Sequence, residues 1–210
     1  MTDLTGPLIG VSFLGGVGGA IALAETPFPR PWADGADVRT YFRGSRRAAR
    51  LSALGQAVSA VALARFTRTV ARLAATRSPA LQRTAVAGGA VAAVSLATSA
   101  AAATTLTLRE VDDETALRLS RRAFVAGGPV HGVGFGALTA ALVLGGSADL
   151  PRWVVATGLA SAVCGAGSPL YFLWTPAGWL IPAGRFPGLV VAAVAGPLLS
   201  SRPATAGSRS

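Results

Sequence analysis

The sequence has few charged residues, no lysine, one cysteine and one histidine. Asp, Glu, Lys and Arg make up only 13% of its 210 residues, against about 25% in ordinary soluble domains, whereas 51% are hydrophobic. This composition argues against a soluble globular domain. Because Cys164 is the single cysteine, an internal disulfide and a cysteine-rich metal site are excluded.

The sequence also lacks the common enzyme motifs, since HExxH, GxSxG, Walker and CxxC patterns are all absent. Gly132, Gly134 and Ala137 fit the dinucleotide pattern G-x-G-x-x-A. The flanking segments LSRRAFVAGGP and ALTAALVL, however, are not the strand and soluble crossover unit that this motif requires. The acidic residues 112–114 lie among arginines, as in a solvated loop with surface ion pairs. We therefore expect no enzyme activity, no cofactor and no bound metal.

All 19 basic residues are arginine, and the formal net charge is +10. A charge of this size can indicate a nucleic-acid partner. Here the arginines gather between apolar runs and form no single stripe with interleaved aromatic residues, which is typical of loops that flank membrane spans. The expected partner is therefore the lipid bilayer and not a nucleic acid.

Long apolar runs alternate with these arginine-rich segments along the whole chain. Since a membrane-spanning helix needs about 20 mainly apolar residues, the pattern predicts an all-α, polytopic transmembrane helical bundle with six spans. The spans are expected at residues 8–24, 50–70, 85–108, 123–144, 153–173 and 180–199. We expect residues 1–200 to form a single transmembrane domain and residues 201–210 to form a disordered tail. Residues 1–7 contain no Lys or Arg, which argues against a cleaved signal peptide.

The second expected span has an alternative interpretation. Its uncharged run, residues 51–64, is short, and Arg65, Arg68 and Arg72 then recur at helical spacing, so one face could lie along the lipid headgroups. A five-span bundle with this interfacial helix would gather most arginines on one side, whereas six spans divide them almost evenly. Both the number of spans and the orientation stay open at this point.

The stretch GGPVHGVGFG contains glycines at every fourth position. Gly128, Gly132 and Gly136 would lie on one face of a helix, where the absence of side chains lets a neighbouring helix approach closely. Gly15 and Gly19 form the same pattern in the first span. We predict that these five glycines are helix-packing positions.

Three expected spans carry a polar side chain near their starts, namely Gln56, His131 and Arg185. These spans would run parallel, so the three side chains would share one leaflet, about 8 to 12 Å inside the apolar region. Glu25 and Tyr171 would open to the same side. Polar groups at membrane depth indicate function by default, and this set would form a small cationic pocket. The alternatives are an arginine that snorkels to the interface, a glutamine that joins two helices, and a neutral histidine bonded to a carbonyl.

Two functions are compatible with these patterns. The first is a multi-pass integral protein of the cell membrane that binds or transports a small polar or anionic ligand. The second is a structural membrane subunit whose glycine faces hold a second copy of the chain or another membrane protein.

Short motifs resemble a group of small multi-span membrane proteins of actinobacteria. They are Tyr41-Phe42 before the second expected span, Ala123-Phe124 with Gly127-Gly128-Pro129 in the fourth, and Ala183-Gly184-Arg185-Phe186 in the sixth. That group has no established activity, so the resemblance implies no catalytic residue. It implies that the second span is a true span and that both termini are cytoplasmic. The sequence departs from the group at Ser120 and Arg121, where a more acidic, histidine-containing stretch would be expected.

Overall fold

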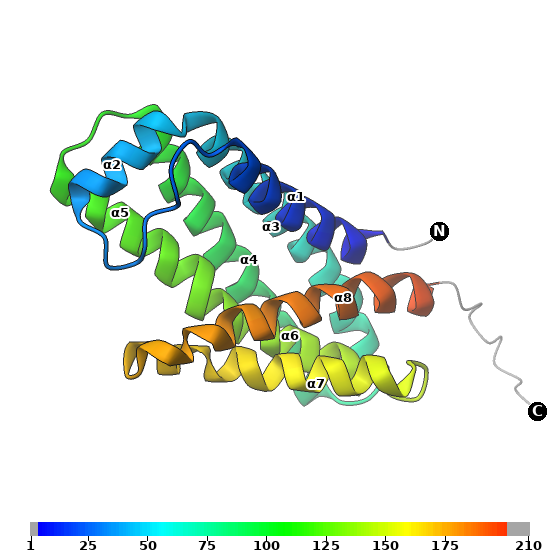
Figure 1. Cartoon of the computed structure of the whole chain (residues 1–210). Helices are drawn as coiled ribbons and strands as arrows, with labels where there is room; N and C mark the ends of the chain where they lie inside the picture. The colour runs from blue at the N-terminus through cyan, green and yellow to red at the C-terminus, as the bar shows by residue number, and fades with distance from the viewer. Residues whose placement is uncertain (1–3, 201–210) are drawn as a thin grey trace, which may run out of the picture.

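The computed structural model describes residues 4–200, in which helices are joined by loops and no strand is present. The α-helices are α1 (Thr5–Leu23), α2 (Gly35–Gly44), α3 (Arg46–Ala75), α4 (Pro79–Leu108), α5 (Asp113–Val125), α6 (His131–Gly145), α7 (Arg152–Gly167) and α8 (Leu180–Ser200) (Figure 1). A π-helical turn, η1 (Ala126–Val130), joins α5 to α6 in one continuous rod. Two short 3-10 turns, η2 (Ser168–Phe172) and η3 (Thr175–Trp179), connect α7 to α8. The prediction of an all-α fold is confirmed.

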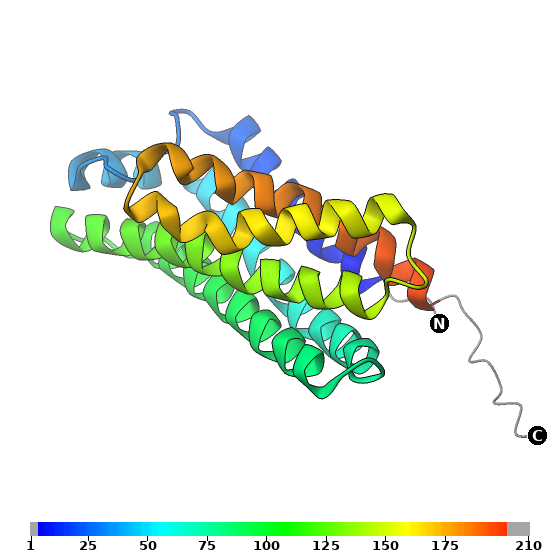
Figure 2. The same cartoon turned by 90° about the horizontal axis from the view of Figure 1, so that it is seen from below.

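The long helices form an antiparallel bundle in which α3 packs between α1 and α4 along its length (Figures 1 and 2). The pair α7 and α8 lies across α6, and α8 also contacts α1. We call the two ends of the bundle the cap end and the terminal end. The cap end holds residues 24–34, α2, the start of α5 and the η2–η3 connection. The terminal end holds the start of α1 and the end of α8.

Within residues 4–200, five helices are long and apolar enough to cross a membrane. They are Thr5–Leu23, Pro79–Leu108, Asp113–Gly145, Arg152–Phe172 and Thr175–Leu199. The structure therefore has the helices of a multi-pass membrane protein. The expected span 50–70 lies within α3, which has the length of a span but carries arginines towards both of its ends. The tail predicted at 201–210 lies outside the described residues.

Helices α1 and α3 touch at the level of their backbones. A Cβ atom built on Gly16 would lie 2.9 Å from the Cα atom of Gly55, and one built on Gly55 would lie 2.5 Å from the Ser12 carbonyl oxygen. The prediction for Gly15 is wrong within this chain, because nothing lies within 4 Å of its Cβ position. The residue that meets α3 is Gly16, one position further along the chain, and one residue corresponds to a turn of about 100° around a helix. The neighbouring prediction holds, since Gly19 packs against the Leu51 side chain.

The predicted glycine face of the fourth span is used by two neighbours. Gly132 packs against Ser168 at the end of α7, and Gly136 lies against Ala162 of α7, where an added Cβ would be 3.0 Å from the carbonyl oxygen. Gly128 faces Ile181 of α8 instead. These three glycines therefore pack α6 and η1 against the α7–α8 pair.

The sequence analysis did not single out Gly134 as a packing position. A Cβ atom there would lie 2.6 Å from the backbone nitrogen of Ala92 and 2.8 Å from the carbonyl oxygen of Gly88, so it provides the contact between α6 and α4. Glycines thus face neighbours on two sides of α6, and this helix is enclosed within the bundle.

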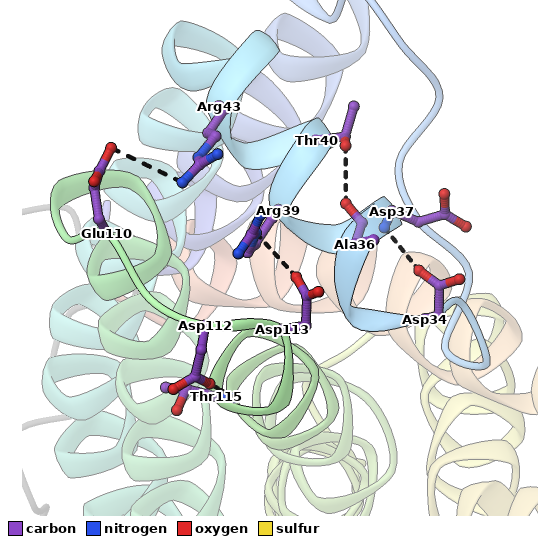
Figure 3. Close-up of polar contacts among 10 residues, drawn as sticks. All are labelled: Asp34, Ala36, Asp37, Arg39, Thr40, Arg43, Glu110, Asp112, Asp113 and Thr115. Atoms are coloured by element: carbon purple, nitrogen blue, oxygen red, sulfur yellow. Dashed lines mark hydrogen bonds and ion pairs between the residues drawn. The ribbon is translucent and has the colours of Figure 1, made fainter.

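A small helical cap closes the cap end. Helix α2 packs on α5 around a separate apolar cluster that includes Val38, and two ion pairs join the segments, Arg39 to Asp113 at 3.0 Å and Arg43 to Glu110 at 3.9 Å (Figure 3). The carboxylates of Asp34 and Asp112 accept bonds from the backbone amides of Asp37 and Thr115, and they cap the first turns of α2 and α5 (Figure 3). These ion pairs therefore hold the segment before α3 beside the segment after α4, at the cap end of the bundle.

Candidate ligand site

A cavity of about 740 Å³ lies at the cap end. Its walls come from α1, α3, α4, the α5–η1 junction and α8, and residues 24–31 and α2 cover it. Most lining side chains are aliphatic or aromatic. The volume falls within the range of about 300–1,000 Å³ that is typical of small-molecule sites.

Arg185 of α8 projects into this cavity. One terminal nitrogen of its guanidinium donates a hydrogen bond to the carbonyl oxygen of Gly127. The guanidinium carbon lies 4.9 Å from the centre of the Phe13 ring, within the range of a cation–π contact. The Nε atom is buried without a hydrogen-bond partner, and no carboxylate within residues 4–200 forms an ion pair with this arginine. The guanidinium charge is therefore held inside the bundle, and its Nε donor has no partner.

The π-helical turn explains why the Gly127 carbonyl can accept this bond. The amide of His131 donates to Ala126, five residues earlier, and to Gly128. In an α-helix the same amide would donate to Gly127. Pro129 lies inside this turn and has no amide hydrogen to contribute. The altered pattern of backbone hydrogen bonds leaves the Gly127 oxygen accessible to a side chain from α8.

Gln56 of α3 lines the same cavity. Its amide nitrogen donates to the Ser52 hydroxyl at 3.3 Å, on the same helix, and its Oε1 atom is buried without a partner. The cavity thus contains one unpaired buried donor, on Arg185, and one unpaired buried acceptor. Buried polar atoms without partners are uncommon, and each calls for a functional or structural reason.

The five predicted site residues divide into two groups. Gln56, Arg185 and Glu25 all line the cavity, with Glu25 exposed at its outer edge. His131 and Tyr171 do not line it. Of the three side chains predicted to converge, only Gln56 and Arg185 line the same cavity.

His131 occupies a separate buried position between α4 and α6. Only 3% of its surface is exposed, its Nδ1 atom lies 3.0 Å from the carbonyl oxygen of Ala92, and its ring stacks on Phe135 at 5.5 Å. This arrangement matches the alternative of a histidine bonded to a carbonyl. Tyr171 lies in η2, where its ring packs against Phe124 at 5.2 Å and Phe172 at 5.8 Å.

The sequence analysis did not identify the aromatic wall of the cavity. Phe13, Tyr41, Phe42 and Phe124 come from three different helices and follow no common spacing. Burial raises the pKa of the Tyr41 hydroxyl above its usual value of 10.0. Only Tyr41-Phe42 and Ala123-Phe124 had been noticed, as part of a resemblance and not as site residues.

The described residues contain no group of three or more His, Cys, Asp or Glu side chains that could hold a metal ion. No protein family, no curated protein and no solved structure matches this chain. The arrangement can offer an arginine donor and a glutamine acceptor inside an otherwise apolar cavity. Such a site is suited to binding.

Proposed function

We propose that this chain is a multi-pass integral membrane protein that binds a small ligand with an anionic group in the cavity at the cap end. The observation that carries the proposal is Arg185, a charged side chain at the depth of the spans with no acidic partner among the described residues and an unpaired Nε atom. A charge in that environment is costly, and such residues usually serve a ligand or a pathway. The unpaired acceptor on Gln56 supports a ligand that also carries a donor group.

We also propose that α3 crosses the membrane, so that six helices span it. The ion pair between Arg39 and Asp113 joins the segment before α3 to the segment after α4. Because α4 is long and apolar enough to span a membrane, the chain must return along α3 before α4 begins. The packing of α3 between α1 and α4 supports the same conclusion. Its arginines lie near its two ends, where they can reach the headgroups.

The proposed location is the cell membrane, with both termini in the cytoplasm. The terminal end carries exposed arginines that are accompanied by few acidic residues. They are Arg65, Arg68, Arg72, Arg77, Arg83 and Arg152. At the cap end, three arginines form ion pairs with acidic residues, namely Arg39, Arg43 and Arg118. The exposed arginines at the terminal end, which have few acidic neighbours, are suited to contact with an anionic leaflet.

The alternative function, a structural subunit that holds a membrane partner or a second copy through its glycine faces, has less support. Gly128, Gly132 and Gly136 are buried against α7, η2 and α8 of the same chain. Gly19 packs on α3. Four of the five predicted glycines are therefore already occupied within the bundle, and only Gly15 faces away from the chain.

Replacing Arg185 with glutamine tests the proposed function. The full-length protein in phosphatidylcholine nanodiscs is titrated with radiolabelled octanoate, and binding is measured by scintillation proximity. We expect Arg185→Gln to weaken binding about 30-fold or more, because removing one partner of a buried charge pair costs about 2 kcal/mol or more. Arg185→Lys, which keeps the charge but loses the planar fork, should weaken it less.

Arg122→Gln is the matched control, because Arg122 is exposed on α5 and lies outside the cavity. Its octanoate affinity should equal that of the unmodified protein. If the unmodified protein does not bind octanoate, or if Arg185→Gln binds it equally well, the proposed function is wrong.

A further inference from the structure

We infer that the ligand is an amphiphile with an anionic oxygen headgroup and a single apolar chain, and that it enters the cavity from the bilayer between α1 and α8. The inference rests on the proposed function and specifies its ligand. It is carried by the division of the cavity into a small polar floor and a long apolar wall, and by the place where the cavity reaches the surface.

One group of polar side chains lies together in the cavity. Arg185, Gln56 and Ser99 come from three helices that meet near Gly127, whose Cβ position lies 2.6 Å from the Ser99 hydroxyl and 3.9 Å from the Gln56 oxygen. An oxyanion placed here would lie beside the guanidinium group of Arg185 and could accept a charge-assisted hydrogen bond from it. It would neutralise a charge that has no acidic partner among residues 4–200.

The apolar wall begins at the Phe13 ring and continues along α1 towards the cap end. Val17 and Ile21 follow on the same helix, and Ile181 and Phe186 line the cavity from α8. A ligand that filled only the polar floor would leave this apolar surface uncovered. A hydrocarbon chain extending from the headgroup would cover it and would gain about 0.8 kcal/mol for each buried methylene group.

The cavity reaches the surface between α1 and α8. Near the terminal end these helices touch, since Gly6 lies against the Ala192 carbonyl and Gly10 against Leu189. Towards the cap end they diverge (Figure 1). Two lining residues there are exposed, Ile21 of α1 by 74% and Phe186 of α8 by 46%.

Both helices at this opening are long and apolar enough to span a membrane, so the opening faces hydrocarbon and not water. Glu25, the one acidic lining residue, is exposed at the outer edge of the cavity. A ligand oriented with its headgroup towards Arg185 keeps its negative charge away from this carboxylate. The neutral hydrocarbon chain of the ligand can then extend through the apolar opening.

The test is a competition assay with the full-length protein in phosphatidylcholine nanodiscs and radiolabelled palmitate as the probe. Four competitors test the contributions of the anionic headgroup and of the apolar chain separately. They are palmitate, hexadecyl phosphate, hexadecanol and butyrate. We expect the two charged long-chain compounds to compete, and hexadecanol and butyrate each to be weaker by about tenfold or more. The order of palmitate and hexadecyl phosphate distinguishes a carboxylate from a phosphate headgroup.

Two variants of α4 provide a steric test that leaves Arg185 in place. Ala103 lines the cavity, so Ala103→Phe should fill it and weaken palmitate binding by about tenfold or more. Ala101 is exposed on the same helix, and Ala101→Phe should have no effect. In the unmodified protein, palmitate with a diazirine in its chain should cross-link to peptides containing residues 17–21 and 181–186.

The outcomes separate this inference from the proposed function. If butyrate binds as tightly as palmitate and Arg185→Gln abolishes both, the proposed function stands and the amphiphile is excluded. If hexadecanol binds as tightly as palmitate, the anionic headgroup is excluded. Cross-linking confined to other helices would contradict entry between α1 and α8, whatever the behaviour of Ala103→Phe.

Discussion

Replacing Gly16 with leucine is expected to separate α1 from α3. The Cβ atom alone would lie 2.9 Å from the Gly55 Cα atom and 3.2 Å from the Leu51 carbonyl oxygen, both of which are backbone atoms that cannot rotate away. The rest of the leucine side chain would deepen the overlap. Because α1 also forms a wall of the cavity, its displacement should abolish octanoate binding as well.

The expected loss for Gly16→Leu is about 3 kcal/mol, at the upper end of the usual overpacking range, which corresponds to a melting temperature lower by about 6 to 12 °C. Circular dichroism of the purified protein in detergent measures this loss. Gly15→Leu is the matched control, because nothing lies within 4 Å of its Cβ position. It should melt within about 2 °C of the unmodified protein. Equal melting temperatures for the two variants would contradict the close α1–α3 contact.

Labelling of introduced cysteines is expected to place the segments before α2 and after α4 on the same side of the membrane. In a Cys164→Ala background, single cysteines replace the exposed residues Ala36, Ala75, Leu108 and Ala148. A thiol reagent that cannot cross the membrane should label positions 36 and 108 from one side. It should label positions 75 and 148 only from the other side.

This pattern distinguishes six spans from five without reference to the orientation of the protein. If α3 lay along the headgroups, position 75 would share the side of position 36, and position 108 would lie opposite both. The structure predicts the first result because the Arg39–Asp113 ion pair joins the chain on either side of the α3–α4 pair. Labelling after solubilisation in detergent serves as the control that every cysteine is reactive.

Much of the fold could be predicted from local properties of the sequence. The expected spans 8–24, 85–108 and 180–199 fall close to α1, α4 and α8. In lipid, an uninterrupted apolar run forms a helix, and the ends of the run are close to the ends of that helix. The fourth span was expected to begin at residue 123, whereas the rod begins at Asp113. The segment Asp113–Val125 is amphipathic and rich in charge, so hydropathy detects only the apolar part of a helix that continues into the cap.

The site was predicted only in part. Near the start of a span, depth follows from residue count and rise, and Gln56 and Arg185 do line one cavity. Depth does not specify the direction in which a side chain points around its helix. His131 lies on a face of α6 directed at α4, and its ring is bonded to Ala92 instead of opening into the cavity.

The sequence by itself determined that this chain is helical, that several of its apolar runs are long enough to cross a membrane, and that its arginines lie between the apolar runs. Those properties depend on the composition of short segments and on the hydrogen-bonding demands of the bilayer. Only the tertiary structure decided that Gly16 and not Gly15 meets α3, and that a π-helical turn releases the Gly127 carbonyl to Arg185. The rotation of each helix is set by its neighbours, and such contacts join residues that are far apart in the chain.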